Sequence, residues 1–146
     1  MPTRDITQAD VELHRFYAFA KPVFDAYFPD FVWRLTTVYR SPSEQLVEFT
    51  SHRSNCDGVE KVSGHNVIPT RAIDGGIFRK SDGAYIDTIP DFPDSLRKAL
   101  YAFIGLLAEL HGLRWGADWN GNGVPVGVDR LESLNDPYHI EKKAAK

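Results

Sequence analysis

The sequence has little cysteine, no strongly charged segment and no long apolar run. Cys56 is the one cysteine among 146 residues, which excludes an intramolecular disulfide, so the fold has to rest on its core. The 17 Lys and Arg against 20 Asp and Glu give a formal charge of −3, without the basic run that is typical of a nucleic-acid surface. We therefore expect no nucleic-acid partner.

Signals for export or membrane insertion are also missing. The richest apolar stretch, residues 99–110, is shorter than the roughly 20 residues that cross a bilayer, and it contains Glu109. The N-terminal residues include acids and no continuous apolar segment, unlike a secretory signal. We expect cytoplasmic synthesis without a signal peptide and no membrane insertion. If its target lies outside the membrane, the protein would need a separate route to reach it.

The length and composition are those of one globular unit. A chain of 146 residues with 42% hydrophobic and 12% aromatic side chains is large enough to bury a core and leaves little room for a second domain. We expect a single domain, residues 1–146, that acts as a monomer.

Two segments in the first third carry helix signals. Thr7, followed by Asp10, indicates an N-cap before residues of helical periodicity, and Pro22 is expected to kink or divide that helix. The segment Ser41–Glu44 combines a cap, a first-turn proline and a capping-box acid, which predicts a helix over residues 42–50.

The remaining elements predict the fold class. Apolar residues at helical spacing predict a helix over residues 94–111, ended by Gly112. Strands are predicted over residues 31–39, 71–78, 85–87, 113–115 and 138–141, the second and third joined in a hairpin through residues 82–83. The mixed order without βαβ regularity predicts an α+β fold with a small, mainly antiparallel sheet packed with helices.

Three residues could converge on a metal ion. His65 precedes a turn, Asp74 lies on the strand that follows, and His139 lies on the last strand. Two imidazoles and one carboxylate are the ligand set of a catalytic zinc site with an open position for water, and a second carboxylate is then needed as general base. The spacing alone leaves open that these are structural histidines. We expect no metal role for His14, His52 and His111.

These residues belong to five blocks that follow one another along the chain. They are YRSPSEQ at residues 39–45, SGH at 63–65, RAID at 71–74, WGADW at 115–119 and DPYHIE at 136–141. Each block alone is common, whereas five in this order are specific. The series resembles the D-alanyl-D-alanine carboxypeptidase and L-alanyl-D-glutamate endopeptidase superfamily of zinc peptidases, above all its bacteriophage endolysin members.

The resemblance implies a function and roles for individual residues. It implies zinc held by His65, Asp74 and His139 on the face of the sheet, and Asp136 as the catalytic base. Arg40, with Gln45, would bind substrate, Arg40 pairing with the developing oxyanion or a substrate carboxylate. A salt bridge at the start of the following helix is the alternative for Arg40.

The implied activity is hydrolysis of the peptide stem of peptidoglycan between L-Ala and D-Glu, by an endolysin that reaches the wall through a separate pore. The alternatives are a D-Ala-D-Ala carboxypeptidase or dipeptidase, and a metal-bound wall-binding module without catalysis. Catalysis by a serine or cysteine nucleophile is disfavoured. No Gly-x-Ser-x-Gly motif occurs, and Cys56 lies in a polar loop. The Ser63 hydroxyl is expected to hydrogen-bond locally.

Two features depart from the family pattern. Nine positions separate His65 from Asp74, more than the common family spacing. The pair Gly75-Gly76 follows Asp74 where bulkier apolar residues are usual, and we expect it to loosen the strand.

A second metal site is predicted in the loop before the last strand. Asp118, Asn120, Asn122 and Asp129 stand at positions 1, 3, 5 and 12 of a segment with glycine at position 6, the ligand spacing of a calcium loop. Pro125 and the lack of flanking helices argue against a full EF-hand. The alternative to a Ca²⁺-binding turn is an Asn-Gly loop in which Asp118 caps backbone amides.

Overall fold

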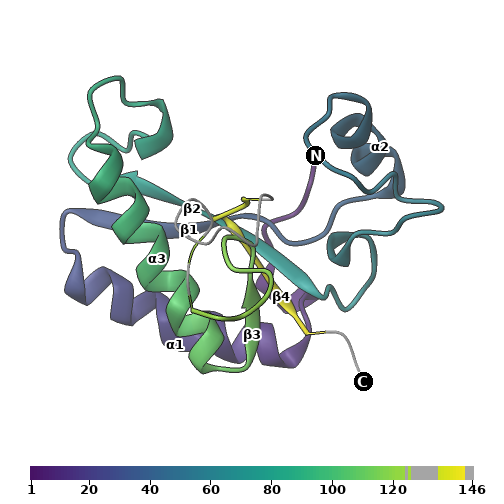
Figure 1. The fold of residues 1–146 in the computed structure, drawn as a ribbon, viewed down its shortest axis with the longest axis horizontal. Coiled ribbons are helices and arrows are strands. Elements are labelled where there is room, and N and C mark those ends of the chain that lie inside the picture. The colour runs from purple at the N-terminus through teal and green to yellow at the C-terminus, as the bar shows by residue number, and fades with distance from the viewer. Residues whose placement is uncertain (124, 126–134, 144–146) are drawn as a thin grey trace.

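The computed structural model describes residues 1–123, 125 and 135–143. Within these residues the fold is α+β, with a four-stranded antiparallel sheet in the order β1-β2-β4-β3 (Figure 1). The strands are β1 (Phe31–Thr37), β2 (Ala72–Arg79), β3 (Leu113–Trp115) and β4 (His139–Lys142). The helices are α1 (Val11–Tyr27), α2 (Pro42–Thr50) and α3 (Asp94–Leu110), with short 3-10 turns η1 (Ile6–Gln8), η2 (Gly64–Asn66) and η3 (Ile86–Thr88). The predicted fold class is confirmed.

The first helix differs from its prediction at two points. Asp10 rather than Thr7 is the N-cap of α1, its carboxylate accepting the Glu12 amide at 3.0 Å. Pro22 lies inside the helix, which continues to Tyr27, so of the two expected outcomes division is wrong, and a kink stays a prediction. Pro22 has no backbone N–H, so one hydrogen bond of the helix is lost. This loss is tolerated because one face of α1 is buried along its length, through Leu13, Phe16, Ala20 and Phe24.

The second helix follows its sequence signals closely. Ser41 accepts the Glu44 amide at 3.2 Å and Glu44 accepts the Ser41 amide at 3.0 Å, which completes the capping box. The predicted strand at residues 85–87 is wrong. Tyr85 makes an isolated bridge to Phe78, and the chain then turns into η3, where Thr88 donates to the Tyr85 carbonyl.

The core lies between the sheet and two of the helices. Figure 1 shows α1 and α3 side by side, with α2 set apart near the N-terminus. The largest buried side chains include Phe16, Phe24, Trp33, Ile73, Ile77, Leu100, Trp115 and Ile140. Among the described residues, no helix combines the length and hydropathy needed to cross a membrane.

The register of β2 and β4 decides which residues face the core. Ile73 pairs with Ile140 and both are buried in the core cluster. Asp74 pairs with His139, one position along each strand. Since successive side chains of a strand point to opposite faces, this pair of polar residues lies together on the other face of the sheet.

The glycine pair after Asp74 does not interrupt the strand. β2 continues from Ala72 to Arg79, but its register with β1 shifts beside Gly75, between Leu35 and Thr37 of β1, so the expected loosening stays a prediction. A Cβ on Gly75 would lie 2.0 Å from Trp33 Nε1. Gly75 pairs with Leu35 of the neighbouring strand β1. The missing side chain therefore makes room for a buried indole.

We expect Gly75→Ala to destabilise the protein by about 1–3 kcal/mol, because the added methyl group overpacks against Trp33. Urea unfolding gives the free energy. Trp33→Phe removes the indole nitrogen, so the double variant should lose less stability than the sum of the single variants, with a coupling of about 0.5–3 kcal/mol. Strictly additive losses would contradict this packing.

Candidate metal centre

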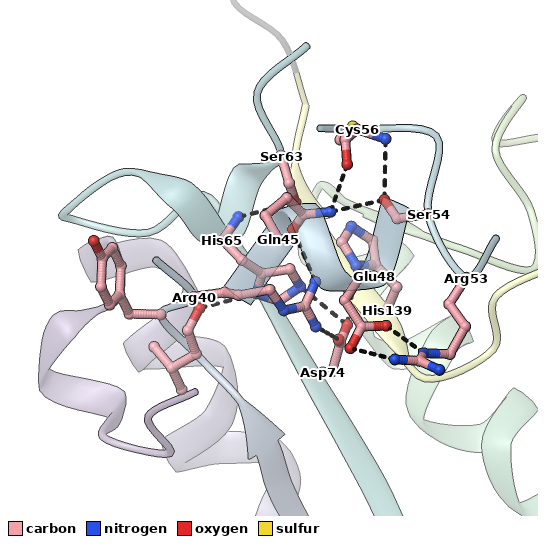
Figure 2. Close-up of polar contacts among 12 residues, drawn as sticks. Arg40, Gln45, Glu48, Arg53, Ser54, Cys56, Ser63, His65, Asp74 and His139 are labelled. Atoms are coloured by element: carbon pink, nitrogen blue, oxygen red, sulfur yellow. Dashed lines mark hydrogen bonds and ion pairs between the residues drawn. The ribbon is translucent and has the colours of Figure 1, made fainter. Parts of the chain in front are cut away.

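The structure brings His65, Asp74 and His139 together. One ligand atom from each lies within 4.8 Å of the other two. Asp74 Oδ1 is 3.2 Å from His65 Nε2 and 3.0 Å from His139 Nδ1. Figure 2 shows the three side chains beside one another. Both imidazoles are buried. Among the described residues, this is the one cluster of three or more His, Cys, Asp or Glu side chains that could surround an ion.

The position and tautomer of His65 are fixed by its surroundings. Ser63 caps η2 by accepting the His65 amide at 3.3 Å, which confirms the local role expected for that hydroxyl. His65 Nδ1 lies 2.8 Å from the Val38 carbonyl, which can only accept, so the ring proton is on Nδ1 and Nε2 is left facing the cluster. The long interval before Asp74 is accommodated because the Arg71 amide donates to the Gly64 carbonyl at 2.9 Å.

The donor set fits a divalent cation such as Zn²⁺. His65 Nε2 is buried and makes no hydrogen bond: with the ring proton on Nδ1, it and Asp74 Oδ1, 3.2 Å away, are two acceptors that face each other, which is costly. A metal ion held by the three residues would satisfy this atom. Two imidazoles with one carboxylate suit Zn²⁺, whereas Ca²⁺ prefers oxygen ligands throughout.

The carboxylate of Glu141 contacts His139 at the ring nitrogen that is not beside Asp74. His139 Nε2 lies 2.9 Å from Glu141 Oε1, since residues two apart on β4 share a face. Burial opposes the charged imidazolium, but hydrogen bonds to Asp74 and Glu141 outweigh it and raise the pKa of His139 to about 10. Burial likewise opposes ionisation of Glu141, and the hydrogen bond from His139 outweighs it and lowers the pKa of Glu141. The sequence interpretation gave Glu141 no role, although the strand alternation was a signal for one.

Asp136 lies beside this cluster. Burial, and then the negative charge of Asp74, raise the pKa of the Asp136 carboxyl, while His139 and His65 act in the opposite direction. Its backbone is fixed by Gly116, whose carbonyl accepts the Asp136 amide at 2.8 Å. A Cβ on Gly116 would lie 2.2 Å from the Asp136 carbonyl oxygen, so only glycine allows this approach. The WGADW and DPYHIE blocks therefore meet at the site.

Arg40 also faces the cluster. Its Nη2 is 3.8 Å from Asp74 Oδ2, so it pairs with the metal site rather than with an acid at the start of α2. Its Nη1 donates to Gln45 Oε1 at 2.9 Å. Gln45 is completely buried, and its amide nitrogen donates to Ser54 Oγ and the Cys56 carbonyl, both at 2.9 Å (Figure 2). The expected substrate contact of Gln45 is therefore corrected, because its amide is used within the protein to orient Arg40.

The predicted calcium loop is described only in part. Asp118 is buried, and its carboxylate accepts the backbone amides of Asn122 at 3.2 Å and Gly123 at 2.7 Å. Asn120 Oδ1 also accepts the backbone amide of Asn122, at 3.1 Å. This is the backbone-capping arrangement named above as the alternative. Asp129 lies outside the described residues, so Ca²⁺ binding stays a prediction.

Comparison with known proteins adds a distant structural likeness. No protein-family model matches the chain, and no curated protein matches it. A similar solved structure is the Zn(II) complex of a point mutant of the vancomycin-resistance D,D-pentapeptidase VanY from a VanB-type resistance cassette. It has a TM-score of 0.45 and 14% identity, and the match covers 92% of this chain and 72% of that one. Likeness at this level assigns no activity to this chain.

We expect zinc affinity to rise with pH between pH 6 and 8. The pKa of His139 is about 10 without metal, so its Nδ1 carries a proton that Zn²⁺ must displace, and each pH unit should strengthen binding about tenfold for each proton released. Titration calorimetry in buffers of different ionisation enthalpy counts the protons. Asp74→Asn should bind far more weakly, whereas His52→Ala, in a polar loop, should bind normally. A flat pH profile would contradict this protonation state.

Proposed function

We propose that the protein is a zinc peptidase that hydrolyses peptidoglycan stem peptides between L-Ala and D-Glu, as endolysins of the resembling superfamily do. The observation that carries the proposal is the convergence of His65, Asp74 and His139 beside the partly buried carboxyl of Asp136. The five sequence blocks support it, because each of them supplies a residue that holds or adjoins this cluster.

The three clustered residues would hold the metal. A zinc ion there would supply Lewis acidity, which polarises a carbonyl and lowers the pKa of a bound water to about 7. Asp136 would accept a proton from the attacking water and return it to the leaving amine. Its raised pKa suits both directions of transfer, since a general acid–base works best when its pKa approaches the working pH.

Arg40 has a different task. Its guanidinium lies 3.8 Å from Asp74 and is held by Gln45 at 2.9 Å, so its direction is fixed before substrate arrives. A planar guanidinium in a largely buried position can hold the carbonyl oxygen as it gains charge, or a substrate carboxylate.

The second task of Arg40 keeps a D-Ala-D-Ala carboxypeptidase or dipeptidase as the alternative activity, because such substrates end in a free carboxylate. A wall-binding module without catalysis is less well supported. Asp136 lies partly buried next to the cluster without being one of its three ligand residues, and a pure binding module has no use for a proton-transfer group there.

Cellular context belongs to the same proposal. We propose cytoplasmic synthesis, action on the wall after release through a separate pore, and a monomeric enzyme whose one macromolecular partner is the peptidoglycan stem.

Asp136→Asn should bind zinc normally and lose hydrolysis by at least about 100-fold, since it removes the proton acceptor and leaves the ligands in place. Zinc content is measured by elemental analysis and hydrolysis by release of soluble wall fragments. Asp91→Asn changes an exposed acid in the same way and should behave as wild type. Full activity of the Asp136 variant would contradict the mechanism.

Digestion of purified peptidoglycan, with and without a chelator, tests the activity itself. We expect new amino termini on D-Glu, identified by mass spectrometry, and none after zinc removal. Release of D-Ala would instead establish the carboxypeptidase alternative. A zinc-loaded protein that binds the wall and yields no new termini would establish the binding module.

A further inference from the structure

A turn of four residues, Asp136 to His139, carries both the proposed base and one metal ligand. Tyr138 lies between them. Its carbonyl accepts the Gly75 amide at 3.0 Å, and the preceding Pro137 carbonyl accepts Trp115 Nε1, also at 3.0 Å. These contacts restrain the backbone of the turn, and one further contact restrains it through a side chain.

That contact is a hydrogen bond from the Tyr138 hydroxyl to Asp87 Oδ2. Asp87 belongs to η3, 51 positions earlier in the chain, and only 17% of its side chain is exposed. His139 faces the metal cluster, whereas the Tyr138 side chain turns towards α3, where its ring meets Tyr101 edge-on with centroids 5.0 Å apart.

Asp87 is itself held in place from α3. Its Oδ1 accepts the Tyr101 hydroxyl at 3.2 Å and lies 3.8 Å from Arg97 Nε. Burial raises the pKa of Tyr101 and of Tyr138, so both phenols stay protonated and act as donors to this carboxylate. A largely buried carboxylate with two phenol donors and a guanidinium is a rigid anchor.

The anchor acts on a segment where small displacements matter. A catalytic group that moves by about 1 Å can lose about 100-fold in rate, and loss of a partner outside the ligand set typically lowers metal affinity or activity about 10–100-fold. The hydrogen bonds and ion pair of Asp87 go to Tyr101, Tyr138 and Arg97, and through Tyr138 it restrains the residues on both sides.

We propose that Asp87 is a positioning residue, which acts through Tyr138 to hold the base Asp136 and the ligand His139 in register with Asp74 and His65. The role of the base rests on the proposed function; the restraint on the turn does not.

The test compares Tyr138→Phe with Tyr101→Phe. Each substitution removes one hydroxyl that donates to Asp87 and keeps the aromatic ring of the tyrosine. Only Tyr138 belongs to the turn. Tyr138→Phe should weaken Zn²⁺ binding about 10–100-fold in a chelator competition and lower kcat more than KM. It should also speed hydrogen exchange at the amides of Gly75, Asp136 and His139, which bond within or to the turn. Asp87→Asn should reproduce these effects and add little to them in the double variant.

Tyr101→Phe is the matched control. It loses the same acceptor and the bond from the Ile77 amide, so its thermal stability should fall at least as much. Because Arg97 and Tyr138 still contact Asp87, its zinc affinity, kcat and exchange at the three amides should change far less than in Tyr138→Phe. Equal effects of both variants on these readouts would overturn the proposal and leave Asp87 a general stability residue.

The outcome also separates this proposal from the proposed function. If the wild-type protein binds zinc and cleaves no peptide, the function fails, while zinc affinity and exchange still decide the positioning role. Exchange of the metal-free protein decides it even if zinc does not bind. Unchanged exchange in Tyr138→Phe would refute it.

Discussion

The pairing of Asp74 with His139 across β2 and β4 is the constraint on which the candidate site depends. The same register that places these two residues opposite each other places Ile73 opposite Ile140 in the core. A slip of one residue would turn the isoleucines to solvent and the polar pair into the core. Burial of the apolar pair therefore holds the metal-binding pair in register. A change that shifts the packing of the core would also shift the geometry of the site.

Charge compensation explains why so many ionisable groups are accommodated in one place. Asp74 lies between two imidazoles and within 3.8 Å of Arg40, and His139 lies between two carboxylates. A buried charge is costly unless it is paired, and here each is shared by more than one partner. Removing a single member would leave the others uncompensated, which makes this a site whose parts depend on one another.

Close backbone approach is the second requirement, and glycine supplies it. Gly116 lets the turn before β4 lie against the end of β3, and Gly75 leaves space for Trp33 behind β2. Gly75 directly follows the ligand residue Asp74 in the sequence, whereas Gly116 meets Asp136 and His139 only in the folded structure. The role of Glu141 follows similarly, from its place two residues after His139 on the same strand.

Local signals in the sequence determined much of this protein. The capping box at Ser41 and Glu44 predicted α2 with its observed limits, and the apolar spacing of α3 predicted a helix that ends within one residue of the observed Leu110. The antiparallel α+β class also followed from local pattern, because caps, turns and periodicity involve residues a few positions apart. The three clustered residues were found through a resemblance of blocks, since spacing alone left structural histidines open.

Tertiary structure decided what depends on distant partners. Pro22 stays within α1 because that helix is packed against the core, and residues 85–87 bend into η3, where Asp87 meets Tyr101 and Tyr138. Gln45 was expected to reach substrate, but it is buried and orients Arg40. His139 meets Asp74 across 65 positions of chain. No local pattern encodes such contacts, because they form only when the packed sheet and helices bring remote segments within hydrogen-bonding distance.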